Sequence, residues 1–347
     1  MSRTFPDPQS AAAMPEAPPP LAAPWQREMQ AAIRSLEGLL AALGLTPDDV
    51  AVSPSAAAQF PVLVTPTMLA RMRPGDPHDP LLLQFLPRHE ESLPQPPGFG
   101  TDPVAEAGML RGEGLLQKYA GRLLAVTTGA CAVHCRYCFR RHFPYGEQHA
   151  GAGQWQELLA LLREDASLEE LILSGGDPLM LTNRRLAALL KPLAQLNTVR
   201  RLRIHTRLPV VLPSRIDRGL LELLGEAAQD VVVVVHVNHA RELDTEAEAA
   251  LARLRARGAL LLNQAVLLRG INDTVDAQAE LWRRLGEAGV LAYYLHLLDP
   301  VSGAAHFEVD ETRARALIAA LRAQLPGYLV PRLARETPGE ASKTVLA

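Results

Sequence analysis

The sequence predicts an α/β fold in which six parallel strands and their crossover helices form an open (β/α)6 partial barrel, with an N-terminal helical cap. From residue 122 onward, short apolar runs alternate with amphipathic stretches, a pattern typical of parallel sheets joined by helices. The expected strands are Leu123–Thr127, Leu171–Leu173, Leu202–His205, Val231–His236, Leu260–Val266 and Tyr293–Leu298. The expected helices are 155–164, 183–195, 217–227, 244–257, 276–288 and 310–324. Six units are too few for a closed eight-stranded barrel.

The chain outside the predicted barrel divides into three segments. Residues 1–24 are rich in Pro and Ala and show no sustained period, which predicts a disordered arm. Residues 25–110 are the predicted N-terminal cap: apolar residues recur at helical spacing over residues 25–60, and Pro and Gly interrupt the remainder. The barrel core is expected at residues 111–330, followed by a C-terminal segment at residues 331–347.

The composition argues against some classes of partner. The chain has 347 residues, of which 48% are hydrophobic, so it is long enough to bury a large core. Its formal net charge of -3 gives no reason to expect nucleic acid or an anionic membrane as a partner. The longest apolar runs, such as Val231–Val235, are too short to span a bilayer, and the N-terminus has no signal pattern, so a cytoplasmic location is expected.

Polar residues gather directly after the predicted strands. These positions are Cys131–Cys138, Ser174–Asp177, His205–Arg207, His236–His239, Asn263–Gln264 and Asp299. The carboxyl ends of parallel strands meet on one face, and in β/α folds that face carries the active site. The site is therefore expected there, with His205, His236 and His239 either lining the pocket or satisfied by backbone carbonyls.

The cysteines form one C-x3-C-x2-C motif, Cys131, Cys135 and Cys138, which uses every cysteine of the chain. An odd number of cysteines within eight residues is not a disulfide framework. Three thiolates hold three corners of a 4Fe–4S cluster and leave the fourth iron open. An open iron suits S-adenosylmethionine, whose amino and carboxylate groups chelate it while the cluster passes an electron to the sulfonium.

A zinc site is the alternative interpretation of the same motif. It would use the three cysteines with His134 or His142 as the fourth ligand. The turn Ser174-Gly175-Gly176-Asp177 after the next strand favours the iron–sulfur cluster, because two glycines let the backbone approach the methionine part of the cofactor.

Only three lysines are available for the Schiff base that a pyridoxal phosphate enzyme needs. Lys191 lies on a polar stretch of a predicted crossover helix, and Lys118 precedes the first barrel strand. Lys343 lies in a stretch near the C-terminus that is able to fold back over the open barrel. Spacing alone favours the interpretation of Lys343 as a mobile tail residue.

The segment Cys131–Tyr145, CAVHCRYCFRRHFPY, resembles the lysine 2,3-aminomutase family of radical S-adenosylmethionine enzymes. Further similar motifs are SGGDPLM at 174–180, RLPVVLPSRI at 207–216, NQAVLLRGIND at 263–273, YYLHLLD at 293–299 and GAAHF at 303–307. The similarity runs from about Asp76 to Lys343. RRHFPY, LARE and GEASKT are similar in particular to the branch that makes (R)-β-lysine for elongation factor P.

The resemblance implies the open radical SAM barrel and three cofactors: a 4Fe–4S cluster, S-adenosylmethionine and pyridoxal 5′-phosphate. Cys131, Cys135 and Cys138 would hold the cluster, and Lys343 would form the Schiff base. The resemblance aligns Tyr119 and Arg122 with the pyridoxal phosphate site. The residues expected near S-adenosylmethionine are Ser174, Gly175, Gly176, Asp177 and Gln264.

The resemblance also implies how the substrate is held. Arg140 aligns with the arginine that grips the substrate carboxylate, and Asp299 with a carboxylate that holds the ε-ammonium of lysine. Glu336 replaces a second ammonium-binding aspartate and is one methylene longer. The sequence ends soon after Lys343, so we expect no structural zinc and a dimer or monomer.

The implied function is conversion of L-lysine to β-lysine, in the (R) form, for the modification of translation elongation factor P. The expected partners are elongation factor P with its lysyl-transferring enzyme, and a flavodoxin or ferredoxin as reductant. Three alternatives remain open: an aminomutase that makes a free β-amino acid from lysine or another amino acid such as glutamate, a radical enzyme without pyridoxal phosphate, and a zinc-stabilised binding module without catalysis.

Overall fold

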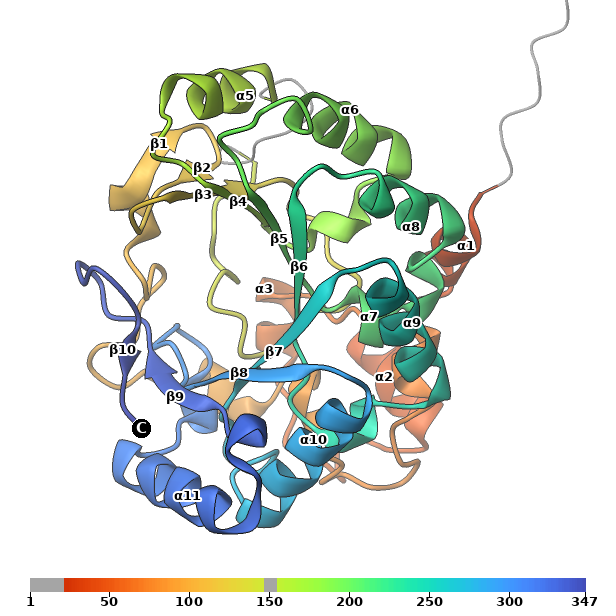
Figure 1. Cartoon of the computed structure of the whole chain (residues 1–347). Coiled ribbons are helices and arrows are strands. Elements are labelled where there is room, and N and C mark those ends of the chain that lie inside the picture. The colour runs from red at the N-terminus through yellow and green to blue at the C-terminus, as the bar shows by residue number, and fades with distance from the viewer. Residues whose placement is uncertain (1–21, 147–154) are drawn as a thin grey trace, which may run out of the picture.

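The computed structural model describes residues 22–146 and 155–347, so most of the predicted arm lies outside the described residues. Ten strands form one sheet, and they follow one another in the sheet in the order of the sequence, from β1 to β10. Figure 1 shows the strands arranged along an arc, with helices on its outer side. This arrangement leaves the inner side of the arc for the site.

Six parallel strands and the helices that follow them make up the barrel. The strands are β3 (Arg122–Val126), β4 (Glu170–Ser174), β5 (Arg201–Thr206), β6 (Asp230–Val235), β7 (Leu260–Val266) and β8 (Leu291–His296). Each pairs in parallel with the next. The helices are α5 (Trp155–Glu164), α6 (Asn183–Leu193), α8 (Arg218–Gly225), α9 (Thr245–Ala256), α10 (Val275–Glu287) and α11 (Glu311–Gln324). The predicted open (β/α)6 partial barrel is confirmed.

Short strands extend both edges of the barrel. At one edge, β1 (Leu110–Gly112) and β2 (Leu115–Leu116) form an antiparallel hairpin on β3. At the other, β9 (Arg332–Arg335) pairs in parallel with β8, and β10 (Thr344–Val345) returns antiparallel to β9. The predicted C-terminal segment is therefore part of the sheet, and Lys343 is fixed beside an edge strand.

The N-terminal region contains short helices instead of the continuous helical stretch expected over residues 25–60. They are α1 (Pro24–Gln30), α2 (Leu36–Leu43), α3 (Pro54–Gln59) and α4 (Pro66–Leu69). The chain leaves the helical path at Ile33, which pairs with Val64 through two backbone hydrogen bonds of 2.9 and 3.0 Å. Ser35 caps the start of α2, and Gly44 ends it with a φ of 65°.

The remaining helical elements are single turns. One α-helical turn, α7 (Leu208–Val211), follows β5. The 3-10 turns are Leu82–Gln84, His89–Ser92, Glu106–Met109, Pro178–Met180, Pro213–Arg215, Ala240–Glu242, Ala305–Phe307 and Gly327–Leu329.

One hydrophobic core joins the N-terminal region to the barrel. Leu39 and Met68 from the N-terminal helices belong to the same buried cluster as Leu171 in β4 and Trp282 in α10. Among the described residues, we find no helix with the length and apolar character that a bilayer crossing requires.

A buried ion pair fastens the N-terminal region to the cysteine loop, residues 128–146. Arg136 donates from Nε and Nη2 to the two carboxylate oxygens of Glu91 at 2.9 and 2.6 Å, and Arg141 donates to the same carboxylate at 2.9 Å. The side chain of Arg136 is 0% exposed and that of Glu91 is 1% exposed. A buried charge is costly without a partner of opposite charge, and the Glu91 carboxylate is that partner for two guanidinium groups.

We expect Glu91→Ala to destabilise the metal-free protein by ~3–5 kcal/mol, because it leaves two buried cations unpaired. Urea unfolding followed by circular dichroism measures the change. The control is Arg218→Ala, whose partner Glu222 lies 2.6 Å away and whose own side chain is 90% exposed, so its loss should cost less than about 1 kcal/mol. Equal losses in the two variants would contradict this role for Glu91.

Candidate active site

One cavity of about 550 Å³ opens at the carboxyl ends of β3 to β8. A volume of this size suits ligands as large as cofactors. The predicted site residues that line it are Tyr119, Arg122, Cys131, Cys135, Cys138, Arg140, Ser174, Gly175, Gly176, Asp177, Gln264, Asp299, Glu336 and Lys343. The structure thus brings together every residue predicted for the site, although they span more than two hundred positions of the chain.

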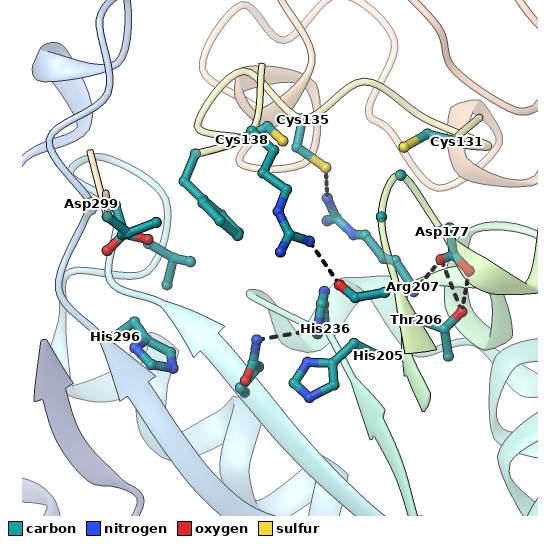
Figure 2. Close-up of a pocket in the computed structure, with 18 of the residues that line it drawn as sticks. Cys131, Cys135, Cys138, Asp177, His205, Thr206, Arg207, His236, His296 and Asp299 are labelled. Carbon is teal, nitrogen blue, oxygen red and sulfur yellow. Dashed lines mark hydrogen bonds between the residues drawn. The ribbon is translucent and has the colours of Figure 1, made fainter. Parts of the chain in front are cut away.

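The cysteine loop follows β3 and forms one side of the cavity. Figure 2 shows Cys131, Cys135 and Cys138 on this side, across from His205, His236 and His296. The N-terminal region holds the loop through its backbone: His134 N donates to Leu63 O at 3.0 Å, and Arg136 N donates to Gln84 O at 2.9 Å. The positions of the cysteines therefore depend on the N-terminal region as well as on the barrel.

The glycines of the SGGD turn let this turn pack directly on the cysteine loop. A Cβ at Gly175, where φ is +129°, would lie 2.4 Å from the carbonyl oxygen of Thr128, and a Cβ at Gly176 would lie 2.4 Å from that of Ala130. Gly176 N donates to Thr128 O at 2.7 Å. Both glycines are therefore needed for the contact between the SGGD turn and the cysteine loop, whether or not a cofactor also approaches the turn.

Asp177 ties the same turn to the end of β5. Its carboxylate accepts hydrogen bonds from Thr206 Oγ1 at 2.8 Å and Arg207 N at 2.7 Å (Figure 2), and from Leu179 N at 3.0 Å. Burial raises the pKa of Asp177 to about 6, against the effect of these donors. The carboxylate of Asp177 therefore holds the SGGD turn against the end of β5 at the rim of the cavity.

The thiol groups are suited to metal binding. Burial raises the pKa of Cys131 well above its usual value and that of Cys138 to about 11. Without a metal these thiols stay protonated, and binding of iron would displace their protons. Cys135 Sγ accepts a hydrogen bond from Arg207 Nη1 at 2.8 Å. The donor set fits an iron–sulfur cluster.

Each of the two histidines of the zinc alternative has one ring nitrogen next to a backbone carbonyl, which leaves its other ring nitrogen for a metal. His134 Nδ1 lies 2.7 Å from Pro61 O, and His142 Nε2 lies 3.2 Å from Ser302 O. Within residues 22–146 and 155–347, no three or more His, Cys, Asp or Glu side chains, the three cysteines included, are grouped to hold a metal ion, so this observation does not separate zinc from iron. Metal analysis of the purified protein separates the two interpretations.

A row of alternating charges runs from Arg140 on the cysteine loop to Lys343 near the C-terminus. Lys343 Nζ forms an ion pair with Glu336, and Lys118 Nζ lies 3.7 Å from Glu336 and 3.4 Å from Glu106. Glu106 in turn binds Arg140 at 2.7 Å. We call these five residues the ion-pair row. Lys343 is therefore held inside the site, not in a free tail.

Tyr119 and Arg122 lie at one end of the ion-pair row. The hydroxyl of Tyr119 donates to Glu336, and the guanidinium carbon of Arg122 lies 5.3 Å from the centre of the Tyr119 ring. Burial opposes ionisation of Glu336, but Lys343 and Tyr119 outweigh it and lower its pKa. Lys343 shares Glu336 with Lys118 and Tyr119, and Arg122 lies beside Tyr119. Cations in this part of the cavity fit a pyridoxal phosphate site, because the phosphate group is negatively charged.

Asp299 faces the cavity beyond the end of β8. Burial raises its pKa to about 6, and Lys343 only partly opposes that rise. No hydrogen bond or ion pair links its carboxylate to another of the described side chains. A half-buried carboxylate without a bonded partner gains from a cationic ligand.

Three histidines form an uncharged floor under these groups. Burial lowers the pKa of His236 to about 3 and those of His205 and His296 well below the usual value, so all three rings are neutral. The rings of His205 and His236 lie 5.7 Å apart, and Gln264 Nε2 lies 3.2 Å from His236 Nε2. His239 does not line the cavity; its ring accepts from Arg241 N at 3.1 Å.

Sequence reasoning missed several residues of the site. Glu106 and His296 line the cavity without having been singled out, and Lys118 was considered only as a Schiff-base candidate. His296 lies within the predicted strand Tyr293–Leu298 and three residues before Asp299, and this position was a usable signal. Glu106 lies in a single 3-10 turn before the barrel, where no periodic pattern points to a site.

Comparisons with known proteins agree with this geometry. Residues 125–274 match the Radical SAM superfamily. The chain is 43% identical over 323 residues to "L-lysine 2,3-aminomutase" of Escherichia coli (strain K12), covering 93% of this chain and 94% of that protein. It is also 43% identical to the protein of the same name from Haemophilus influenzae, covering 93% and 95%.

Among solved structures, a radical SAM methyltransferase from Sphaerobacter thermophilus superposes with a TM-score of 0.46 and 20% identity, covering 64% of this chain and 68% of that chain. The sequence relatives carry the assignment, since they align over nearly their whole length at high identity. The chain therefore belongs to the L-lysine 2,3-aminomutase family of radical SAM proteins.

Proposed function

We propose that this chain is a radical SAM, pyridoxal-phosphate-dependent L-lysine 2,3-aminomutase, an isomerase that moves the α-amino group of lysine to the β-carbon. The observation that carries the proposal is the shared cavity, which is lined by the three cysteines and Arg140 of the cysteine loop and also by Lys343 and Asp299. The named relatives support the same activity, because they cover almost the whole chain.

The residues present fit both cofactors. Cys131, Cys135 and Cys138 would hold the 4Fe–4S cluster with S-adenosylmethionine on its open iron, and Lys343 would hold pyridoxal phosphate beside Tyr119 and Arg122. When bound, the cluster and S-adenosylmethionine supply a carbon radical, and pyridoxal phosphate provides a ring that stabilises an unpaired electron. The cavity walls and the N-terminal region shield this chemistry from water.

The charges of the site favour lysine over glutamate. Arg140 would bind the α-carboxylate, while Asp299 and Glu336 would face the distal ammonium. Glutamate would place a second anion beside Asp299 and leave that carboxylate unpaired, which costs several kcal/mol in a desolvated site. This argues against the glutamate alternative on physical grounds.

We expect binding of lysine to weaken as the pH falls through about 6. Burial raises the pKa of Asp299 to about 6, so below that pH its carboxyl becomes neutral and loses its attraction for an ammonium group. The measurement is kcat/KM against pH, which reports groups of the free enzyme. Asp299→Asn should remove this acidic limb and lower kcat/KM at neutral pH about tenfold or more. An unchanged limb in the variant would assign the titration to another group.

The finer proposal concerns the product and its use. We infer that β-lysine is made in the (R) form and that the lysyl-transferring enzyme of elongation factor P consumes it in the cytoplasm. A flavodoxin or ferredoxin would supply the electron. The support is the similarity of RRHFPY, LARE and GEASKT in this sequence to the corresponding branch of the family.

The test is anaerobic reconstitution with iron, sulfide and pyridoxal phosphate, followed by S-adenosylmethionine and dithionite. L-lysine, L-glutamate and L-arginine are offered separately, and the products are separated by chiral chromatography. The proposal predicts β-lysine alone, in the (R) form, and its acceptance by the lysyl-transferring enzyme. A β-amino acid formed only from glutamate or arginine would refute the substrate assignment, and (S)-β-lysine would refute the finer proposal.

A further inference from the structure

Glu106 holds one edge of the Arg140 guanidinium. It lies outside the barrel and is not among the residues that would hold a cofactor. Arg140 donates from Nε to one carboxylate oxygen of Glu106 at 2.8 Å and from Nη2 to the other at 2.7 Å. This is the bidentate geometry that gives an arginine–carboxylate pair both strength and direction. Both side chains are buried, at 5% and 4% exposure.

Three further contacts fix the guanidinium of Arg140. Nη1 donates to Ser174 Oγ at 2.8 Å. The guanidinium carbon lies 4.9 Å from the centre of the Phe139 ring and 5.7 Å from that of Phe143. Because an arginine has five N–H donors, these contacts leave one on Nη1 and one on Nη2. These two N–H groups remain for a further oxygen acceptor.

Glu106 is itself anchored on its own side. Its backbone N donates to Asp102 Oδ1 at 2.9 Å, and Lys118 Nζ lies 3.4 Å from its carboxylate. Lys118 also reaches Glu336, so the ion-pair row connects Arg140 to the end of the site where Lys343 lies. The carboxylate of Glu106 is therefore fixed before it meets Arg140.

We propose that Glu106 is a positioning residue that occupies the Nε–Nη2 edge of Arg140, so that the remaining N–H groups of Nη1 and Nη2 are presented to the α-carboxylate of lysine. The inference rests on the proposed function, since it takes lysine as the ligand. It adds a residue outside the barrel to the determinants of specificity, because Glu106 selects for a substrate that carries a carboxylate without contacting it.

Two effects of removing the Glu106 charge oppose one another. Loss of the anion leaves Arg140 more positive, which would tighten the binding of a carboxylate. Loss of the bidentate pair frees the guanidinium to rotate, and a glutamine at this position would turn a donor NH2 toward the donors of Arg140. Orientation outweighs charge here, because recognition by two parallel hydrogen bonds depends on a fixed edge.

The test compares two ligands that differ only in the carboxylate, L-lysine and 1,5-diaminopentane. Their binding to the anaerobic holoenzyme, with cluster and pyridoxal phosphate in place and S-adenosylmethionine omitted, is measured by calorimetry. In Glu106→Gln we expect the Kd of lysine to rise about 10- to 100-fold, as for the loss of one or two charge-assisted hydrogen bonds. The Kd of the diamine should stay within about twofold of the wild-type value.

Two further variants separate positioning from folding. Glu106→Asp retains the charge and should restore lysine binding in part. Adding Glu106→Gln to Arg140→Lys should cause no further loss for lysine, since Glu106 acts through the guanidinium. Parallel weakening of both ligands, additive losses in the double variant, or tighter lysine binding in Glu106→Gln would overturn the inference.

The binding experiment does not require turnover, so the two proposals can fail separately. If the wild-type protein binds lysine more tightly than the diamine and yet makes no β-lysine, the proposed function is refuted. The binding data of the Glu106 variants then still decide whether Glu106 positions Arg140. A wild-type protein that makes β-lysine, with lysine binding unaffected by Glu106→Gln, refutes the inference alone.

Discussion

Cys138→Ser should abolish the reductive cleavage of S-adenosylmethionine, with a loss of at least about a thousandfold in 5′-deoxyadenosine formation. The chain has only three cysteines, all on one loop, so no other thiol is available to replace the lost ligand. A hydroxyl is a much poorer ligand for iron than a thiolate, and a cluster with two remaining cysteines should be lost. The measurement is iron content and 5′-deoxyadenosine after anaerobic reconstitution and reduction with dithionite.

The control is His142→Gln, because it separates the iron cluster from the zinc alternative. In that alternative His142 is a candidate fourth ligand, whereas in the structure its ring contacts Ser302 O. We expect His142→Gln to keep its iron and to cleave S-adenosylmethionine at close to the wild-type rate. Loss of metal in His142→Gln equal to that in Cys138→Ser would mean that this loop holds a different metal.

Lys343→Ala should remove the covalent attachment of pyridoxal phosphate and lower β-lysine formation at least about a thousandfold. Lys343 lies inside the cavity in contact with Glu336, which distinguishes it from the exposed Lys191, and the family resemblance favours it over Lys118. The measurement is reduction of the holoenzyme with borohydride, then digestion and mass spectrometry of the lysine-containing peptides. The label should be found on Lys343 alone.

The other two lysines serve as internal controls. Lys191 is exposed on α6, and Lys191→Ala should change neither the label nor the activity. Lys118 is the competitor that matters, since it lies in the ion-pair row and contacts Glu336 at 3.7 Å. A label found on Lys118 in the wild-type protein, or retained in full by Lys343→Ala, would refute the assignment.

Much of the barrel could be predicted from the sequence because its elements repeat a local pattern. Each predicted strand overlaps an observed one, and α5 was placed at its observed residues. Apolar runs of three to seven residues bounded by polar ones indicate the buried parallel strands. The position of the site followed as well, because polar residues such as Asp299 come directly after these strands.

The parts that escaped prediction depend on distant partners or on very short elements. The edge hairpins contain strands of only two to four residues, too few to show a period. The helical path of the N-terminal region is interrupted at Ile33 because Ile33 pairs with Val64, and no local sequence pattern predicts this pairing. Glu91 and Glu106 meet Arg136 and Arg140 across 45 and 34 positions of the chain, so their roles appear only in three dimensions.

The most direct test of the account is the metal centre of the wild-type protein purified without oxygen. The account predicts about four iron atoms and four sulfides per chain, and a reduced cluster whose electron paramagnetic resonance signal changes when S-adenosylmethionine binds to its open iron. Zinc in place of iron, or a reduced cluster that gives the same signal with and without S-adenosylmethionine, would contradict it.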